Sequence, residues 1–189
     1  MLKLVGISGS LRQGSLNTAL LRAAQEAVAA KAELEVRTLH GIPLYDADVE
    51  ARDGIPESVA ALKAAIISAD GLLLVTPEYN HGIPGVFKNG IDWLSRPPSD
   101  IARVFGGKPV ALMGASPGGF GTTLSQAAWL PTLTTLGMTH WSGGRLMLAH
   151  ANAAFSEQGV LKEAVIQMQL GQFMSGFVDF TGRIAPRSA

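Results

Sequence analysis

Residues 2–17 read LKLVGISGSLRQGSLN, and this stretch indicates the fold more directly than any other. Positions 2–7 form a short apolar run, as expected of a buried parallel strand. Positions 9–17 follow as a hydroxyl-rich loop, and the residues beyond carry apolar side chains at helical spacing. A strand that passes through a short loop into a helix is the first unit of an α/β domain.

The same alternation of strand and helix continues along the chain. Each predicted strand is a short apolar run bounded by glycine, proline or polar residues, and a helical pattern separates it from the next. Such a chain forms a parallel sheet with helices on both faces and right-handed crossovers. We therefore predict a flavodoxin-like three-layer fold with strand order 2-1-3-4-5, as one domain over residues 1–189. The predicted strands are 2–7, 34–39, 71–75, 110–114 and 143–148.

The composition limits the classes of partner. Apolar residues make up 47% of the 189 positions, and lysine plus arginine equal aspartate plus glutamate at 15 each. A chain without net charge exerts no overall attraction on nucleic acid or on an anionic membrane. The apolar runs are too short for membrane insertion, and the first strand leaves no room for a signal peptide. The absence of cysteine fits a cytoplasmic protein.

The loop at 9–17 has the properties of an anion-binding site. The first N–H groups of a helix have no intrahelical acceptor and lie at the positive end of the helix dipole. Ser10 and Ser15 add hydroxyl donors, and Arg12 adds a planar cation. The phosphate-loop pattern is nearly matched, but no lysine follows Gly14, and no G-x-G-x-x-G is present. The loop therefore suits one monophosphate better than a triphosphate or the pyrophosphate of a dinucleotide.

An ordinary helix amino terminus is the alternative interpretation of this loop. Serine and asparagine are common caps, and Asn17 is a candidate capping residue. Capping explains neither Arg12 nor the presence of both serines, so we favour the anion site.

Two further loops are expected to meet the first one. Ligands of such sheets bind beyond the carboxyl ends of the strands, where the strand order reverses. The loop after the third strand reads TPEYNHGIPG over 76–85, and the loop after the fourth reads ASPGGFG over 115–121. The glycines of the second loop allow its backbone N–H groups to approach a flat ligand. A planar heteroaromatic ring with a polar edge suits this position.

The histidines are assigned ordinary roles. His81 is a possible proton donor, but with no partner carboxylate evident in the sequence we expect it to shape the rim of the pocket. His40, His140 and His150 show no metal-ligand spacing, so no metal site is predicted.

Two polar segments are predicted to lie in solvent without a functional role. The acidic residues between 46 and 53 have the pattern of a solvated loop face. The proline pair within 96–99 marks the expected surface excursion of the chain.

Residues 114–118 read GASPG and match the G-x-S-x-G nucleophile elbow of hydrolases. In that mechanism the residue after the serine donates its N–H to the oxyanion, and Pro117 has no N–H to donate. The chain is also short for a hydrolase of that class. We therefore expect Ser116 to form a hydrogen bond to the edge of a ligand rather than to act as a nucleophile.

Taken together, the segments 9–17, 76–82 and 116–119 resemble the NADPH-dependent FMN reductase family, which includes quinone, azo-dye and chromate reductases. The similarity covers essentially the whole chain, with the motifs in the family's order and spacing. It implies a cofactor, FMN, and a co-substrate, NADPH or NADH. It also implies the residues of the site: Ser10, Arg12, Ser15, Leu16 and Asn17 around the phosphate, Pro77, Glu78, Tyr79 and Asn80 along the isoalloxazine ring, and Ser116, Gly118 and Gly119 near its pyrimidine end.

The resemblance implies a hydride transfer from the nicotinamide to flavin N5 and on to an acceptor, namely a quinone, an azo compound, chromate or free flavin. Backbone N–H groups at 116–119 would stabilise the negative charge that develops on the ring, and no catalytic side chain is expected. Family members are usually dimers or dimers of dimers. We therefore expect a homodimer or homotetramer, with Phe87, Ile91 and Trp93 as candidate contact residues. Core packing explains Phe87 and Ile91 equally well.

Two other functions are compatible with the same loops. A flavodoxin-type electron carrier also holds FMN, but such carriers are typically acidic so that they dock on basic partners, whereas this chain has no net charge. The charge therefore favours an enzyme. An enzyme that reduces free flavin and releases it has the same motifs, so the sequence leaves open whether FMN stays bound.

Overall fold

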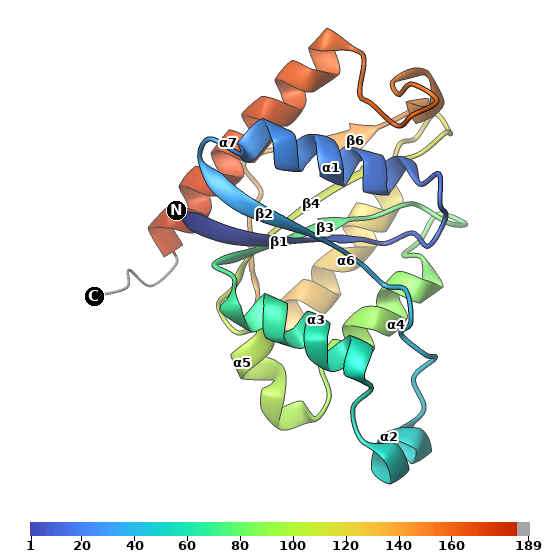
Figure 1. Cartoon of the computed structure of the whole chain (residues 1–189), viewed down its shortest axis with the longest axis vertical. Helices are drawn as coiled ribbons and strands as arrows, with labels where there is room; N and C mark the ends of the chain where they lie inside the picture. The colour runs from blue at the N-terminus through green and yellow to red at the C-terminus, as the bar shows by residue number, and fades with distance from the viewer. Residues whose placement is uncertain (185–189) are drawn as a thin grey trace.

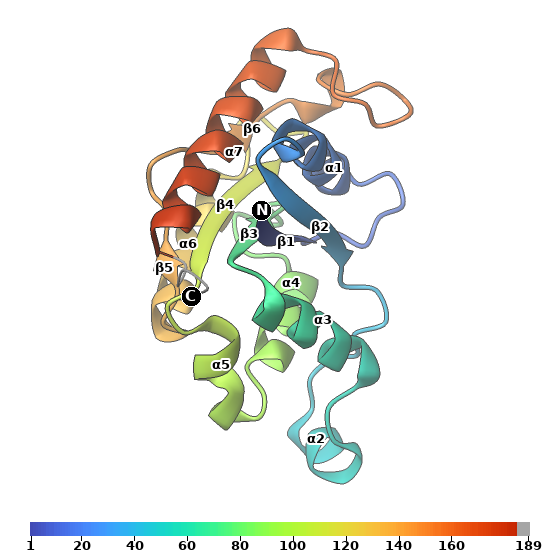
Figure 2. The same cartoon turned by 60° about the vertical axis from the view of Figure 1, so that its left-hand side comes forward.

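A computed structural model describes residues 1–184 and places one parallel sheet between two layers of helices (Figure 1, Figure 2). The strands lie in the order β2-β1-β3-β4-β5, and β6 also pairs with β4. The predicted flavodoxin-like fold and its strand order are therefore confirmed. The strands are β1 (Leu2–Ser8), β2 (Ala32–Thr38), β3 (Gly71–Val75), β4 (Pro109–Ala115), β5 (Thr139–His140) and β6 (Leu146–Leu148).

The helices divide between the two faces of the sheet, as Figure 1 shows. One layer, packed on Leu4 and Met113, consists of α1 (Leu16–Val28) and α7 (Ala164–Ile184). The other layer consists of α3 (Glu57–Ser68), α4 (Gly85–Leu94), α5 (Ile101–Phe105) and α6 (Thr123–Thr135). The short helix α2 (Ala47–Asp53) projects beyond this second layer, and the 3-10 turns are η1 (Pro98–Asp100) and η2 (Ala151–Ala153).

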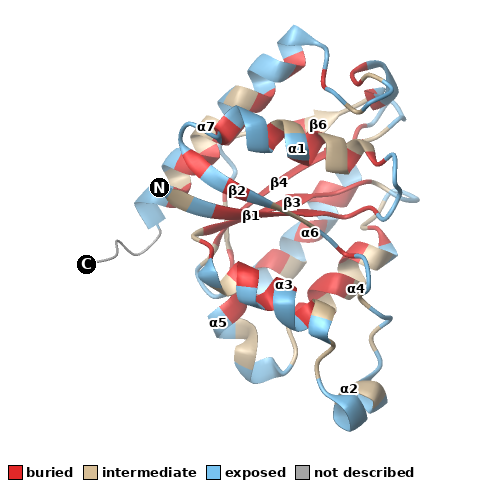
Figure 3. Cartoon of the chain, viewed as in Figure 1, coloured by how far each residue is buried: buried red, intermediate tan, exposed pale blue. Residues whose placement is uncertain are grey.

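The core follows from the alternation of side chains along the central strands. In β1, Leu4 packs with α1 and α7, whereas Val5 and Ile7 pack with the helices of the opposite face. Figure 3 shows the inner strands buried and the outer surfaces of the helices exposed. Within residues 1–184, none of the helices combines the length and the apolar content that a membrane span requires.

The fifth strand differs from the prediction. It is divided into β5, which pairs with Pro109 and Val110, and β6, which pairs with the other end of β4. Only the last three residues of the predicted strand 143–148 are extended. The reason is the indole of Trp141, which packs against Gly143. A Cβ on Gly143 would lie 2.5 Å from Nε1 of this indole. The backbone bends around this buried ring instead of continuing along β4.

The apolar side chains of α4 face the core. Phe87 and Trp93 are 0% exposed and Ile91 is 1% exposed. The indole of Trp93 donates a hydrogen bond to the carbonyl of Pro43 at 2.9 Å. Phe87 and Ile91 therefore follow the alternative of core packing, and the prediction that Trp93 offers contact surface to another subunit is wrong, because all three side chains are buried within this chain.

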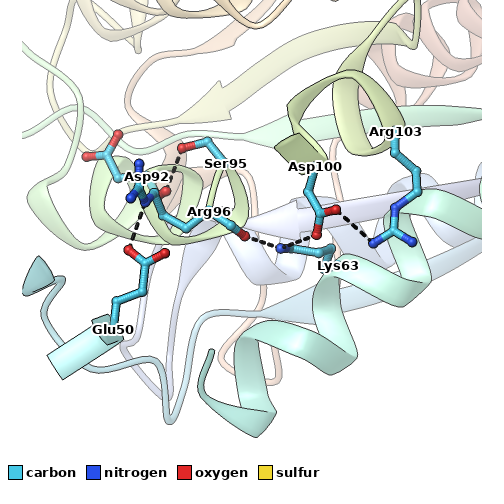
Figure 4. Close-up of polar contacts among 7 residues, drawn as sticks. All are labelled: Glu50, Lys63, Asp92, Ser95, Arg96, Asp100 and Arg103. Carbon is cyan, nitrogen blue, oxygen red and sulfur yellow. Dashed lines mark hydrogen bonds and ion pairs between the residues drawn. The ribbon is translucent and has the colours of Figure 1, made fainter. Parts of the chain in front are cut away.

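The acidic segment predicted as a solvated loop face is a helix, although Asp46, Asp48 and Asp53 are exposed as predicted. Asp46 caps α2 by accepting the N–H of Asp48 at 2.8 Å. Glu50 accepts a hydrogen bond from Arg96 Nε at 2.8 Å (Figure 4). It accepts a second from the Tyr45 hydroxyl at 2.9 Å. The hydrogen bond from Arg96 lowers the pKa of Glu50 from its ordinary value. These contacts join α2 to the residues that follow α4.

The same segment is anchored on its other side by α3. Lys63 is buried and donates hydrogen bonds to the carbonyl of Arg96 and, at 3.1 Å, to Asp100 (Figure 4). Asp100 also pairs with Arg103 at 3.1 Å, and the hydrogen bond from Lys63 lowers the pKa of Asp100. The predicted surface excursion is thus exposed only at 97–99, since Arg96 is partly buried, with its side chain paired to Glu50 and its carbonyl bonded to Lys63.

Candidate functional site

The loops after β1, β3 and β4 meet at the carboxyl edge of the sheet, on the right of Figure 1. Backbone hydrogen bonds tie each loop to its neighbour. Gly9 donates to the carbonyl of Val75 at 2.9 Å, and Thr76 donates to that of Met113 at 2.8 Å. The predicted convergence of the three loops is therefore observed.

The first loop presents unpaired donors at the start of α1. Ser15, rather than Asn17, is the helix cap, since its hydroxyl oxygen accepts the N–H of Thr18 at 3.2 Å. The N–H groups of Leu16 and Asn17 have no acceptor within residues 1–184. The side chain of Arg12 is exposed and has no ion-pair partner in the same part of the chain. Two free N–H groups, a cation and the nearby Ser10 hydroxyl are donors that suit a phosphate.

The side chain of Asn17 has a structural role that the sequence does not reveal. Its Nδ2 donates to the carbonyl of Ala115 at 2.8 Å, and its Oδ1 accepts the N–H of Ala115 at 2.9 Å. The residue is 4% exposed. This pair of hydrogen bonds fixes the start of α1 to the end of β4, so that Asn17 offers a phosphate mainly its backbone N–H.

Gly9 is required by packing. A Cβ at this position would lie 2.1 Å from Cδ1 of Phe87, which is fully buried in α4. The absence of a side chain at Gly9 lets the first loop lie directly against the ring of Phe87. Gly14 has no such neighbour, because its nearest contact would be the Arg12 guanidinium at 3.9 Å.

The loop after β3 exposes an aromatic ring and fixes a carboxylate. Pro77 is buried, whereas Tyr79 is 48% exposed and Asn80 is exposed beside it. The carboxylate of Glu78 accepts the N–H groups of Leu124 and Ser125 at 2.8 and 3.0 Å. Glu78 therefore caps α6, whose own N-cap residue provides no side-chain hydrogen bond.

His81 has the carboxylate partner that the sequence did not reveal. Its Nδ1 lies 3.3 Å from Oε1 of Glu78, three residues earlier in the same loop. The side chain of Glu78 is 6% exposed, and that of His81 is 67% exposed. The imidazole is therefore anchored at one nitrogen and open to solvent on its other side.

The loop after β4 is folded back on itself. The hydroxyl oxygen of Ser116 accepts the N–H of Gly118 at 3.2 Å, and the carbonyl of Gly118 accepts the N–H of His150 at 3.1 Å. The N–H of Gly119 has no acceptor within residues 1–184. Since α6 begins only at Thr123, the strand does not turn directly into a helix, as a nucleophile elbow requires. The hydrolase alternative is therefore excluded by the local geometry.

His150 lies next to the glycine loop, a contact that the sequence does not predict. Its backbone is left-handed, with φ 48°, and a Cβ on Gly119 would lie 3.4 Å from its Nε2. It reaches this place because the backbone of 148–151 is hydrogen-bonded to Ser116 at two points. No sequence spacing connects His150 with the glycine loop.

A cavity of about 670 Å³ lies beside the first loop, between α1 and the segment 155–161. Residues 13–16 border it, but no residue of 77–80 or 116–119 does. The cavity is therefore separate from the place where the three loops meet. Of the predicted site residues, Arg12, Tyr79 and Asn80 are exposed, whereas Ser10, Ser15, Asn17 and Pro77 are buried.

Comparisons with known proteins identify relatives of this chain. An NAD(P)H-dependent FMN reductase of Pseudomonas aeruginosa is 43% identical over 173 residues, which cover 89% of this chain and 91% of that protein. A 2-hydroxy-1,4-benzoquinone reductase of a Burkholderia species is 34% identical over 176 residues, covering 93% of this chain and 94% of that protein. Among solved structures, the flavoenzyme FerB, an NAD(P)H:(acceptor) oxidoreductase from Paracoccus denitrificans, is similar with a TM-score of 0.88 and 32% identity. The match covers 98% of this chain and 100% of that one.

The family described as NADPH-dependent FMN reductase matches residues 2–153, which is most of the chain and contains all three loops. The anion-binding loop, the exposed tyrosine and the glycine loop lie within this match. The chain therefore belongs to the NADPH-dependent FMN reductase family, and it is an oxidoreductase that uses FMN and a nicotinamide nucleotide.

Proposed function

We propose that the chain holds one FMN along the carboxyl edge of the sheet and uses NAD(P)H to reduce a quinone or a similar small acceptor. The observation that carries this proposal is the set of donors without internal partners at Arg12, Leu16 and Asn17, on a loop that is hydrogen-bonded to the loop of the exposed Tyr79. One monophosphate and one flat ring match those two loops.

In this proposal the FMN phosphate is bound by Ser10, Arg12 and Ser15 together with the backbone N–H groups of Leu16 and Asn17. Arg12 supplies the charge, and the helix start supplies oriented dipoles. The ring lies along 77–80, and Ser116, Gly118 and Gly119 face its pyrimidine end. The carboxylate of Glu78 already accepts two N–H groups at the start of α6. Glu78 therefore contributes its backbone to the ring site rather than its carboxylate.

The chemistry supplied by bound FMN is the transfer of a hydride equivalent from the nicotinamide, through flavin N5, to the acceptor. The protein binds and orients the reactants. The free N–H of Gly119 would stabilise negative charge at the edge of the ring, because a fixed backbone dipole needs no reorganisation when charge develops.

Quinones are the first acceptor class to test, since relatives are named quinone reductase and 2-hydroxy-1,4-benzoquinone reductase. Azo compounds, chromate and free flavin are the further candidates.

The proposal includes a homodimer or homotetramer. The side chains of Phe120, Leu124 and Leu130 on and before α6 are 72%, 44% and 43% exposed. Large apolar side chains exposed on and just before this helix favour a surface that another subunit covers. The mass of the protein in solution, measured by light scattering, distinguishes these states from a monomer.

The decisive experiment is an anaerobic absorbance titration of the purified protein with FMN, followed by NADPH and then by a simple quinone. Bleaching of the flavin bands by NADPH and their recovery with quinone is the expected result. Bound flavin that neither NADPH nor NADH bleaches would instead support an electron carrier. Absence of FMN binding would contradict the proposed phosphate site.

A further inference from the structure

The turn at 79–82 holds a histidine in an unusual backbone conformation. Tyr79 and Gly82 exchange two backbone hydrogen bonds, at 3.2 and 3.0 Å, which close a two-residue turn. Asn80 and His81 between them have φ values of 50° and 60°. Such turns favour asparagine followed by glycine, because both central residues are left-handed. A histidine in the place of the glycine is therefore disfavoured by the backbone, and such residues concentrate at functional sites.

The side chain of His81 is held at a fixed orientation. Its Nδ1 donates to Glu78, whose other oxygen is fixed by the first N–H groups of α6. The ring of Phe120 lies against the imidazole, with centroids 6.2 Å apart and planes at 88°. Within residues 1–184, Glu78 is the charged group in contact with this imidazole. Because Nδ1 is committed to the carboxylate, Nε2 is the nitrogen available to a substrate.

We propose that His81, oriented by Glu78, donates the proton that a quinone requires when it is reduced at this site. The inference rests on the proposed function, because it assumes that the acceptor lies over the ring beside 77–80. The quinone gains a hydride equivalent from NAD(P)H by way of the flavin and a proton from Nε2 of the imidazolium. The N–H bond at Nε2 breaks, an O–H bond forms, and the neutral imidazole regains a proton from solvent through its exposed side.

The test is His81→Asn, since asparagine tolerates the left-handed backbone and so preserves the turn. His140→Asn is the matched control, because His140 lies on β5 beside Val110, at the opposite end of β4 from the loops. Rapid mixing measures the two half-reactions separately. In His81→Asn we expect an unchanged Kd for FMN and unchanged flavin reduction by NADPH, but quinone reduction at least about tenfold slower.

Ferricyanide separates proton donation from a general disturbance of the site, because it accepts electrons without a proton. The proposal expects its reduction to proceed at the wild-type rate in His81→Asn. Quinone reduction at the wild-type rate in this variant, or an equal slowing with ferricyanide, would overturn the assignment while leaving the proposed function intact. If the wild-type protein itself is not bleached by NADPH, the proposed function fails, and the role of His81 fails with it.

Discussion

Arg12 is the residue on which recognition of the FMN phosphate depends most directly. Its guanidinium is exposed and lacks an ion-pair partner within residues 1–184, so binding a phosphate does not require an internal salt bridge to break. Arg12→Ala should weaken FMN binding by about 1.5 to 3 kcal/mol, the value of a charged hydrogen bond. Quenching of flavin fluorescence on titration measures this change in Kd.

Arg22→Ala is the control for that variant. Arg22 is also exposed and lies further along the same helix, beside the cavity rather than the helix start. Its removal lowers the net charge by the same amount but removes no predicted phosphate contact. Equal loss of affinity in both variants would indicate a general electrostatic effect and contradict the specific role of Arg12.

A substitution at Gly9 tests how the first loop packs against the buried ring of Phe87. Gly9→Ala places a methyl group 2.1 Å from a carbon of the buried Phe87 ring, so the core must shift to accept it. We expect the free energy of unfolding to fall by about 1 to 3 kcal/mol, as for other overpacked cores. Urea unfolding of the apoprotein measures this, and Gly14→Ala, which meets no atom closer than 3.9 Å, should leave the value nearly unchanged. A similar stability for both variants would contradict the packing role.

At the scale of elements, Asn17 couples α1 to β4. Asn17→Ala removes both hydrogen bonds to Ala115 and leaves a buried backbone N–H and carbonyl without partners. We expect the apoprotein to lose about 2 to 4 kcal/mol of stability, because each unsatisfied buried group costs about 1 to 2 kcal/mol. Ser15→Ala, which removes only the helix cap, should cost about 1 kcal/mol. Denaturant unfolding without FMN distinguishes the two, and a smaller loss for Asn17→Ala than for Ser15→Ala would refute the coupling.

The sequence predicts an element well where burial alone determines it. β3 and β4 are buried along their whole length and β1 is buried from Leu4 onward, and the predicted bounds of all three agree with the structure within one residue at each end. The fifth strand was predicted as continuous because its division depends on the packing of Trp141 against Gly143. The helix α2 does not follow from its local sequence, because the contact that ties it to the rest of the fold, Glu50 with Arg96, spans 46 residues.

The candidate site shows the same distinction. The position of the loops follows from the strand order, so the sequence predicts that 9–17, 76–82 and 116–119 meet. The partners of individual side chains do not follow from it. Glu78 contacts the start of α6 across 46 residues, and Asn17 contacts Ala115 across 98, so neither pairing has a local sequence signal. His81 and Glu78 are three residues apart, but the left-handed turn that brings them together is disfavoured for histidine.

At the scale of the whole molecule, the ion pairs of Figure 4 connect the helices of one layer. Glu50 joins α2 to the end of α4, and Asp100 joins the start of α5 to Lys63 of α3. Hydrogen bonds from Arg96 and Lys63 lower the pKa of Glu50 and of Asp100, respectively, from their ordinary values of 4.5 and 3.8. A carboxylate whose pKa is lower in the folded state stabilises the fold when it is ionised and loses this effect as it is protonated.

This layer therefore determines how stability responds to acid. The contribution of Glu50 to the free energy of unfolding is complete above about pH 4.5 and is lost as the pH falls through its lowered folded pKa. Glu50→Gln should be less stable than the wild type at pH 7, and the difference between the two proteins should shrink as the pH is lowered towards 3. Urea unfolding at both pH values measures this. Glu57→Gln is the control, because Glu57 is exposed in the first turn of α3 and has no salt bridge within residues 1–184. A difference between Glu50→Gln and wild type that stays constant from pH 7 to pH 3 would show that packing around α2, and not the ionised pair, holds this helix in place.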